Sequence, residues 1–336
     1  MRSLWIKLLS GVLVVTGLGA GWAILAFQQF RQAALPVGVA GLEIEIPEGA
    51  SLGRVTSDLH RRGVLPQPVF FKILARLTGT SRKIQAGEYR LTPGTTPDSL
   101  LDMLASGKVI QYPFTIIEGW NFRQLVAALA EAPKINHRLQ GKTQAQIVTE
   151  LGIVERHPEG LFLPDTYHYT AGTTDVELLL RAKRAMDELL AREWPRRDQS
   201  LPLKSPYEAL ILASIVEKET AVPDERRRIA GVFIRRLQKR MRLQTDPTVI
   251  YGMGEAYQGN IRRKDLSTPT PYNTYVIKGL PPTPIAMPGA EAIRAVLHPA
   301  PGKELYFVAR GDGSHHFSET LSEHNRAVRQ FQLKRK

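Results

Sequence analysis

The chain has 336 residues, of which 43% are hydrophobic, and its formal net charge is +13. It is too long for one small core and too apolar for a disordered chain, so we expect two or three globular units. The chain contains no cysteine, which excludes disulfides, thiolate metal sites and lipid attachment through an N-terminal cysteine. A cysteine-free chain suits oxidising and reducing compartments equally.

The first element is the uncharged stretch "LLSGVLVVTGLGAGWAILAF", residues 8–27. About 20 apolar residues span the core of a bilayer, whereas a cleaved signal peptide has an apolar region of about 7 to 15 residues before a small-x-small site. Trp22 and Phe27 stand where those small residues would be. We therefore predict that residues 1–30 form a cytoplasmic stub and an uncleaved transmembrane anchor. The basic residues before the span place the rest of the chain outside the cytoplasm, in the periplasm or wall space of a bacterium.

Residues 40–132 are predicted to form a small α+β unit. A strand at residues 42–47 precedes a helix in which Leu52, Val55 and Leu59 share one face behind Ser51, a plausible N-cap. Further elements are predicted at residues 68–79 (helix), 87–93 (strand), 97–108 (helix, behind Thr96), 112–120 (strand) and 121–132 (helix).

A polar stretch, residues 133–159, is predicted to connect this unit to a second one at residues 160–336. The second unit is expected to contain a helix from about Asp175 to Trp194, a proline-containing linker, and a further helix that starts near Ser205. The expected fold class is α+β with a single N-terminal transmembrane helix, a small α+β unit and a larger, mainly helical unit.

Much of the positive charge lies in residues 225–244, "ERRRIAGVFIRRLQKRMRLQ". Its apolar residues recur at helical spacing, which predicts a packed helix with a solvated basic face. No aromatic residues alternate with the basic ones as in a nucleic-acid stacking platform. We therefore expect no nucleic-acid partner, and an exported domain would instead meet anionic wall polymer or lipid headgroups.

Two glutamates stand one residue apart near the end of an apolar helix, in "ASIVEKETAVPDE", residues 213–225. At about 100° per residue, Ile215 and Leu212 lie within roughly 60° of Glu219, while Glu217 lies about 160° away. Glu219 thus shares the apolar stripe, where burial raises a carboxyl pKa toward that of a general acid. Glu217 is expected to face polar surroundings, Lys218 or an arginine of the next helix. The alternative for Glu219 is a solvated position at a frayed helix end.

Residues 241–254 and 270–289 combine amide, hydroxyl and ring groups with prolines. Proline-rich loops can hold such side chains rigidly beside a cleft, and these groups suit sugar hydroxyls and acetamido groups. The alternative is that both segments are rigid connectors.

The motifs "ASIVEKETAV", "RMRLQTDPTVIYGMG", "YNTY" and "GLPPTPIAMPG" resemble the endolytic murein transglycosylase (MltG, YceG-like) family. The resemblance covers nearly the whole chain, including "EGLFLPDTYHY" and "SHHFSETLSEHN". It implies a single-pass inner-membrane enzyme with a LysM-like N-terminal domain and a lytic-transglycosylase-like catalytic domain that carries a short β-hairpin region. Such carbon–oxygen lyases cut peptidoglycan strands internally and leave 1,6-anhydro-muramoyl ends.

The resemblance implies that Glu219 is the catalytic acid. The order of elements in goose-lysozyme-like lytic transglycosylases, together with the family motifs, implies that Gln244, Thr245, Asp246, Tyr272 and Asn273 surround the substrate. Pro271 stands where such enzymes often have alanine, which weakens the placement of Tyr272. No cofactor is implied. Peptidoglycan glycan strands are the expected partner, and penicillin-binding proteins or other wall synthases are candidates.

Two alternative functions remain. A muramidase would need a second carboxylate, for which Asp246 is the candidate, although "TDPT" is equally typical of a turn capped by Asp. A non-catalytic, membrane-anchored peptidoglycan-binding scaffold would need neither carboxylate. His315, His316 and His324 could suggest a metal, but "ARGDGSHHFS" predicts a hairpin with no carboxylate at ligand spacing, so no metal site is expected.

Overall fold

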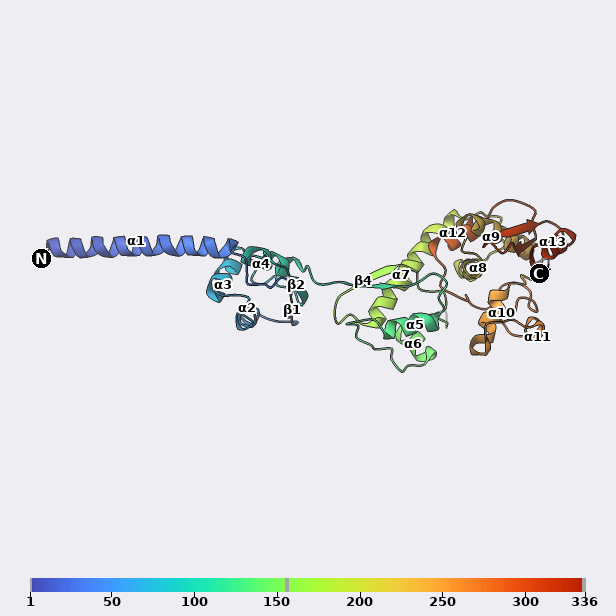
Figure 1. Cartoon of the computed structure of the whole chain (residues 1–336), viewed down its shortest axis with the longest axis horizontal. Helices are drawn as coiled ribbons and strands as arrows, with labels where there is room; N and C mark the ends of the chain where they lie inside the picture. The colour runs from blue at the N-terminus through green and yellow to red at the C-terminus, as the bar shows by residue number, and fades with distance from the viewer. Residues whose placement is uncertain (1, 155–156, 334–336) are drawn as a thin grey trace. The chain divides into compact units, whose positions relative to one another are not determined.

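The computed structural model describes residues 2–154 and 157–333 and divides into two compact units, Met1–Tyr112 and Pro113–Lys336 (Figure 1). This division falls before the join predicted between residues 132 and 160. The segment predicted as the last helix of the first unit belongs to the second, because the Phe122 N–H donates a buried hydrogen bond of 2.9 Å to Glu159.

The first unit begins with α1, a continuous helix at Arg2–Gln32. In the part of the chain that the structure describes, it is the one helix long and apolar enough to cross a membrane, over Leu9–Gln32 with a mean hydropathy of 1.9. Length and composition alone fit either an anchor or a signal sequence. The apolar side chains of the span are exposed, whereas Phe30, near the C-terminal end of α1, is buried in the core of the first unit.

The remainder of the first unit pairs strand β1 (Leu42–Ile46) antiparallel with β2 (Gly87–Leu91), with Ile44 opposite Tyr89. Helices α2 (Leu52–Arg61) and α3 (Pro68–Leu77) lie between the strands in sequence, and α4 (Pro97–Ser106) follows them. Ser51 and Thr96 cap α2 and α4 as predicted, and the alternation of strands and helices confirms a mixed α+β fold. Buried residues of the core include Val55, Leu59, Leu65, Phe71, Leu74, Tyr89, Leu91, Leu100, Leu101 and Leu104.

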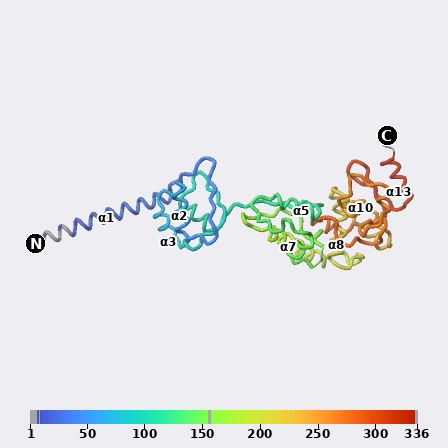
Figure 2. Tube along the Cα trace, turned by 90° about the horizontal axis from the view of Figure 1, so that it is seen from below, coloured from blue at the N-terminus to red at the C-terminus, as the bar shows by residue number. Residues whose placement is uncertain are grey.

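In the second unit, strands β3 (Tyr112–Thr115) and β4 (Thr166–Tyr169) form a two-stranded sheet. Figure 2 shows α5 and α7 at one end of this unit and α10 and α13 at the other. Three helices accompany the sheet: α5 (Phe122–Ala130), α6 (Gln144–Glu150) and α7 (Asp175–Glu193).

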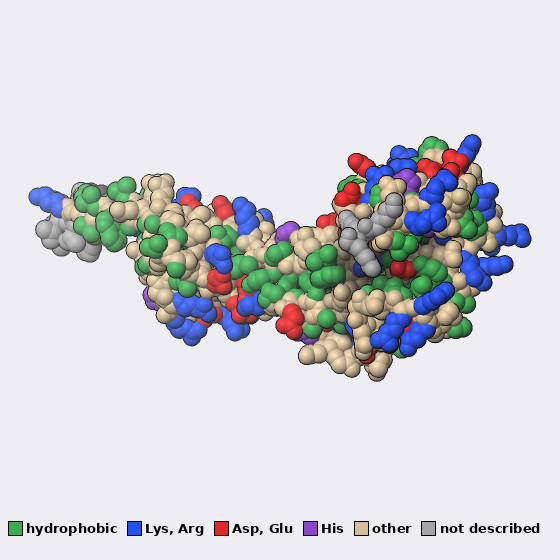
Figure 3. Space-filling model, turned by 45° about the vertical axis from the view of Figure 1, so that its right-hand side comes forward, with side chains coloured by type: hydrophobic (Ala, Val, Ile, Leu, Met, Phe, Trp, Pro, Cys, Tyr) green, Lys and Arg blue, Asp and Glu red, His purple; other side chains and the backbone are tan. Residues whose placement is uncertain are grey.

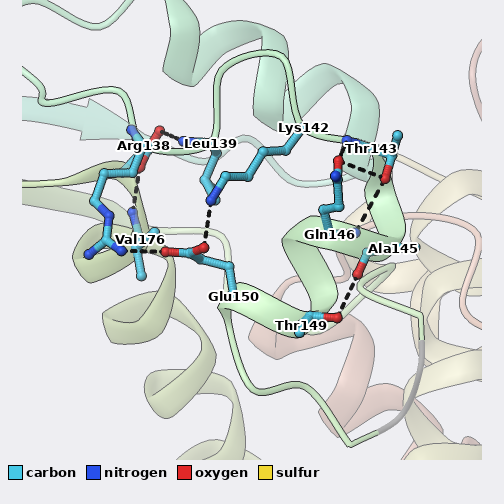
Figure 4. Close-up of polar contacts among 10 residues, drawn as sticks. Arg138, Leu139, Lys142, Thr143, Ala145, Gln146, Thr149, Glu150 and Val176 are labelled. Atoms are coloured by element: carbon cyan, nitrogen blue, oxygen red, sulfur yellow. Dashed lines mark hydrogen bonds and ion pairs between the residues drawn. The ribbon is translucent and has the colours of Figure 1, made fainter.

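Helix α6 lies in the stretch predicted as a polar connection, and polar contacts hold it in place (Figure 4). Glu150 accepts hydrogen bonds of 2.5 Å from both Arg138 and Lys142. At the other end of the helix, Thr143 and Gln146 form a capping box. Seven residues are too few for a helix to be stable alone, so α6 depends on these contacts together with the burial of Leu139, Ile147 and Leu151.

The core of the second unit is built on α8 (Pro206–Glu219), which packs against α9 (Pro223–Gln238), α10 (Asp246–Met253) and α12 (Ala290–Leu297). Eight consecutive residues of α8, Ala209 to Val216, are buried, so the helix is covered on all sides before it reaches its glutamates. The other elements are 3₁₀ turns at Trp194–Arg196 and Gly254–Ala256, α11 (Arg263–Ser267), the antiparallel hairpin β5 (Tyr306–Ala309) and β6 (His315–Ser318), α13 (Leu321–Val328) and a π-helical turn at Arg329–Leu333.

The basic side of α9 is less solvated than predicted. Arg236 is only 7% exposed, and its guanidinium donates to the carbonyls of Leu305 and Leu243 at 2.7 and 2.6 Å. Arg235 donates to the carbonyl of Glu304 and also pairs with its carboxylate. Part of the positive charge therefore ties α9 to the β-hairpin, whereas Arg227, Arg228, Lys239 and Arg240 are exposed, as predicted for a solvated basic face.

Candidate active site

A cavity of about 520 Å³ lies beside the point where α8 ends at Glu219. Segments far apart in the sequence contribute to it, because β5 and α13 complete its wall. Figure 3 shows the second unit hollowed on one face, with acidic and hydrophobic side chains in the hollow and Lys and Arg side chains along the outer edge. The polar and charged residues that line the cavity include Glu219, Arg236, Gln244, Asp246, Tyr275 and His315.

The carboxyl of Glu219 accepts one short side-chain hydrogen bond. The Thr245 hydroxyl donates to its Oε2 at 2.7 Å. Burial raises the pKa of Glu219, the hydrogen bond from Thr245 lowers it, and the nearby Asp246 carboxylate raises it. Because burial is the largest effect, the proton is retained to higher pH than on a solvated glutamate, as a general acid requires.

Glu217 lies on another side of α8. Its side chain is 7% exposed, its Oε2 accepts the Gly289 N–H at 3.0 Å, and Arg226 of α9 lies 4.0 Å from its Oε1. The predicted arginine of the next helix is confirmed. The pKa of Glu217 is also raised, again mainly by burial, so a raised pKa does not separate the two glutamates. Glu219 lines the cavity, and that position distinguishes it.

The segment Gln244–Asp246 brings three predicted site residues to Glu219. Gln244 has a φ of +51°, in the left-handed region that non-glycine residues rarely occupy, and its side chain lines the cavity. Asp246 also lines the cavity and accepts the Tyr275 hydroxyl at 2.7 Å. Thr245 is 2% exposed and contacts Glu219, so it holds the acid and does not line the cavity.

The other two predicted site residues, Tyr272 and Asn273, are not among the cavity-lining residues. Asn273 is 1% exposed, and its amide donates to three carbonyls within residues 265–268, at 2.8 to 3.2 Å. The Tyr272 hydroxyl is 2.9 Å from that of Thr283, and its ring lies 4.8 Å from the Tyr251 ring. Their polar groups thus fix the loop that presents Tyr275.

Tyr251, which packs on Tyr272, connects this loop to the buried Glu159. Its hydroxyl donates to Glu159 at 2.9 Å, and the same carboxyl receives the Phe122 N–H. Burial raises the pKa of Glu159 to about 7. This carboxyl is not among the residues that line the cavity, so it joins α5 to α10 and does not face the candidate substrate site.

Sequence reasoning missed several cavity residues. Tyr275 is the last residue of the "YNTY" motif, of which only Tyr272 and Asn273 are predicted at the site. His315 was considered only as a metal ligand, yet its Nδ1 lies 2.7 Å from Glu225 Oε2 and its backbone N–H donates to Glu225 Oε1 at 2.8 Å. Arg236 is predicted on a solvated face. No local pattern indicates that these residues meet Glu219.

A sequence profile of the YceG-like family matches residues 44–330. The chain belongs to the YceG-like family. It is 31% identical over 310 residues to an endolytic murein transglycosylase of Bacillus subtilis, a match that covers 86% of this chain and 84% of the relative. An enzyme of the same name from Streptococcus pneumoniae is 25% identical over 360 residues, which cover 94% of this chain and 63% of the relative. A 2.6 Å crystal structure of a YceG-like protein from Listeria monocytogenes has 30% identity and a TM-score of 0.54, covering 85% of this chain and 99% of that one.

No group of three or more His, Asp or Glu side chains is placed to hold a metal ion among the described residues of this YceG-like chain. His324 instead stacks on Tyr306, with the ring centroids 5.3 Å apart, and His316 lies 5.6 Å from Phe331. The predicted absence of a metal and of a cofactor stays a prediction.

Thr245→Val is expected to move the alkaline limb of the pH profile of kcat/KM to higher pH in this YceG-like protein. Valine keeps the shape of threonine but removes the hydrogen bond that lowers the pKa of Glu219. The protonated acid would then persist to higher pH. The measurement is kcat/KM against pH on glycan strands, beside Thr245→Ser, which keeps the hydroxyl. An alkaline limb identical to that of the unmodified protein would contradict this role.

Proposed function

We propose that the chain cleaves peptidoglycan glycan strands internally as a lytic transglycosylase, with Glu219 as the catalytic acid. The observation that carries this proposal is a partly buried carboxyl of raised pKa beside a cavity lined by amide, carboxylate, phenol and imidazole groups. The names of its relatives, endolytic murein transglycosylases, support the same class of reaction. The direct test is incubation of the full-length protein with uncrosslinked glycan strands.

In the proposed reaction, protonated Glu219 gives its proton to the glycosidic oxygen between MurNAc and GlcNAc as the bond to the anomeric carbon breaks. The resulting carboxylate then takes the proton of the MurNAc C6 hydroxyl, whose oxygen attacks the anomeric carbon. The product end is a 1,6-anhydro ring, water is not consumed, and Glu219 is protonated again. One carboxyl suffices for both steps.

Gln244, Asp246 and Tyr275 are proposed to bind the sugars, because they line the cavity with Glu219. Thr245 acts through Glu219, and Tyr272 and Asn273 act through the loop that they fix. The predicted substrate-binding set is thereby divided into residues that contact the sugar and residues that position others. A muramidase, with Asp246 as the second carboxylate, is the alternative reaction for the same cavity.

We propose that α1 anchors the protein in the inner membrane and that the catalytic unit is extracytoplasmic. The uncharged span and the basic residues before it support this topology. The protein is expected to stay in the membrane fraction after salt and carbonate washing. A soluble form that begins near residue 28 would contradict the anchor and indicate signal cleavage.

We also propose that the first unit is a LysM-like glycan-binding domain, on the support of its strand, helix, helix, strand order. Wall synthases, penicillin-binding proteins among them, remain candidate partners. In the scaffold alternative, the folded full-length protein would bind strands without cutting them. Binding by Glu219→Gln, measured beside cleavage by the unmodified chain, separates the scaffold from the enzyme.

A further inference from the structure

Helix α3 (Pro68–Leu77) carries apolar side chains on both of its faces. Phe71, Leu74 and Ala75 are buried in the core of the first unit. On the outer side, Val69 is 65% exposed, Ile73 is 38% exposed and Leu77 is 73% exposed. The spacing of four residues places these three in one stripe along the helix. A water-facing helix of a globular domain would normally carry polar residues there, so the stripe calls for a partner surface.

The start of this stripe is continuous with the end of α1. The ring of Phe70 makes edge contacts with Phe27 and Phe30 of α1, at 5.7 and 5.6 Å between centroids. An apolar cavity of about 820 Å³ opens between the two helices, with Trp22 and Leu25 on the α1 side and Val69 on the α3 side. Trp22 and Leu25 are themselves 72% and 67% exposed.

The length of α1 determines where the contact between Phe27 and Phe70 lies relative to the bilayer. A helix rises about 1.5 Å per residue, so about 20 residues from Leu8 cross a hydrocarbon core of about 30 Å and end near Phe27. Since α1 continues without a break to Gln32 and Phe30 belongs to the core, no flexible linker separates the span from the first unit. Side chains packed against Phe27 therefore lie at the membrane surface.

We propose that the stripe formed by Val69, Ile73 and Leu77 lies in the interfacial zone of the outer leaflet, so that the first unit rests on the bilayer. The partner is lipid, because the stripe starts beside the outer end of the span. Lys72 and Arg76 flank the stripe, where their stems can lie along apolar surface while their charged ends reach lipid phosphates. This inference rests on the proposed anchoring role of α1 and is independent of the proposed chemistry.

The absence of cysteine makes a direct test available. Single cysteines at Val69, Ile73 and Leu77 are labelled with an environment-sensitive fluorophore in the full-length protein, which is reconstituted into phosphatidylethanolamine–phosphatidylglycerol vesicles. Leu13→Cys in the span and Glu45→Cys on an exposed strand position provide the lipid and water references. Quenching by spin-labelled lipid and by aqueous iodide is then compared among the five positions.

We expect the three α3 labels to be quenched by spin-labelled lipid and to show an iodide quenching constant several-fold lower than that at position 45. A label that merely enters the protein's own cavity would be shielded from iodide without responding to the lipid quencher, and this result would overturn the proposal. If iodide quenches the α3 labels as strongly as the label at position 45, while spin-labelled lipid quenches the label at position 13, the interfacial stripe is overturned and the anchor is retained. A water-exposed position 13 would remove the anchor and the inference together.

Discussion

Glu219→Gln is expected to lower the turnover of glycan strands by about 10²- to 10⁴-fold, the range that general acid catalysis contributes. The amide matches the carboxyl in shape and can still accept the hydrogen bond from Thr245, but it has no proton to give to the leaving oxygen. The fold should be unchanged. Turnover is measured by chromatography of strand fragments, and folding by thermal unfolding followed by circular dichroism.

Glu217→Gln is the matched control, because it makes the same chemical change two residues away on the same helix. Glu217 accepts the Gly289 N–H and faces Arg226, so its replacement should affect mainly stability, by about 1–3 kcal/mol for a weakened buried interaction with a charged group. Turnover should fall much less than in Glu219→Gln. An inactive Glu217→Gln together with an active Glu219→Gln would show that the helical phase argument selected the wrong glutamate.

Local sequence signals predicted the elements whose stability is local. Ser51 and Thr96 cap the helices that follow them, and the Gly-Asp-Gly sequence turns the hairpin between β5 and β6, where Arg310 and Ser314 close the turn. The phase of α8 places its two glutamates on different sides of the helix, because a helix fixes side-chain directions within a few residues, but burial raises the pKa of both, so the phase alone does not select the acid. These features need no knowledge of the tertiary structure.

The composition of the cavity could not be predicted in the same way. His315 and Arg236 reach it from a hairpin and a helix far apart in the sequence, and their contacts depend on how α9 packs on β5. The amide of Asn273 suited a sugar, yet it donates instead to carbonyls of α11 and of its C-cap residue Thr268. A residue type shows what a side chain can bond to, and only the fold decides which partner it meets.

The same limit applies to the boundary between the units. The polar composition of residues 133–159 favoured a linker, but α6 within it is fixed by Glu150, and Asp175 accepts the N–H groups of Arg138 and Leu139. Such charge-assisted hydrogen bonds are stronger than neutral ones, and together with the buried side chains of Leu139, Ile147 and Leu151 they order the polar segment. Hydrophobicity along the chain therefore placed the boundary too far toward the C-terminus relative to the observed compact units.

The masses of the products are expected to show that Glu219 acts without a second catalytic carboxylate. If the C6 hydroxyl closes on the anomeric carbon, each new muramoyl end is a 1,6-anhydro ring, lighter by one water than a reducing end and inert to borohydride. A hydrolase that paired Glu219 with Asp246 would add one water at each cut and leave an end that borohydride reduces. Mass spectrometry before and after borohydride treatment distinguishes the two reactions, and internal cleavage predicts short oligosaccharides of mixed length.

Asp246→Asn provides the matched variant for this experiment. The asparagine side chain can still accept the Tyr275 hydroxyl, so the cavity should keep its shape and cleavage should stay within about tenfold of the unmodified protein, since the general acid is retained. Removing the Asp246 charge also removes an effect that raises the pKa of Glu219, so the alkaline limb of activity should move to lower pH. Borohydride-reducible ends as the main product, with cleavage lost in Asp246→Asn, would establish a muramidase. A folded full-length protein that binds strands and releases no fragments would instead establish the scaffold, because neither carboxyl would then be performing chemistry.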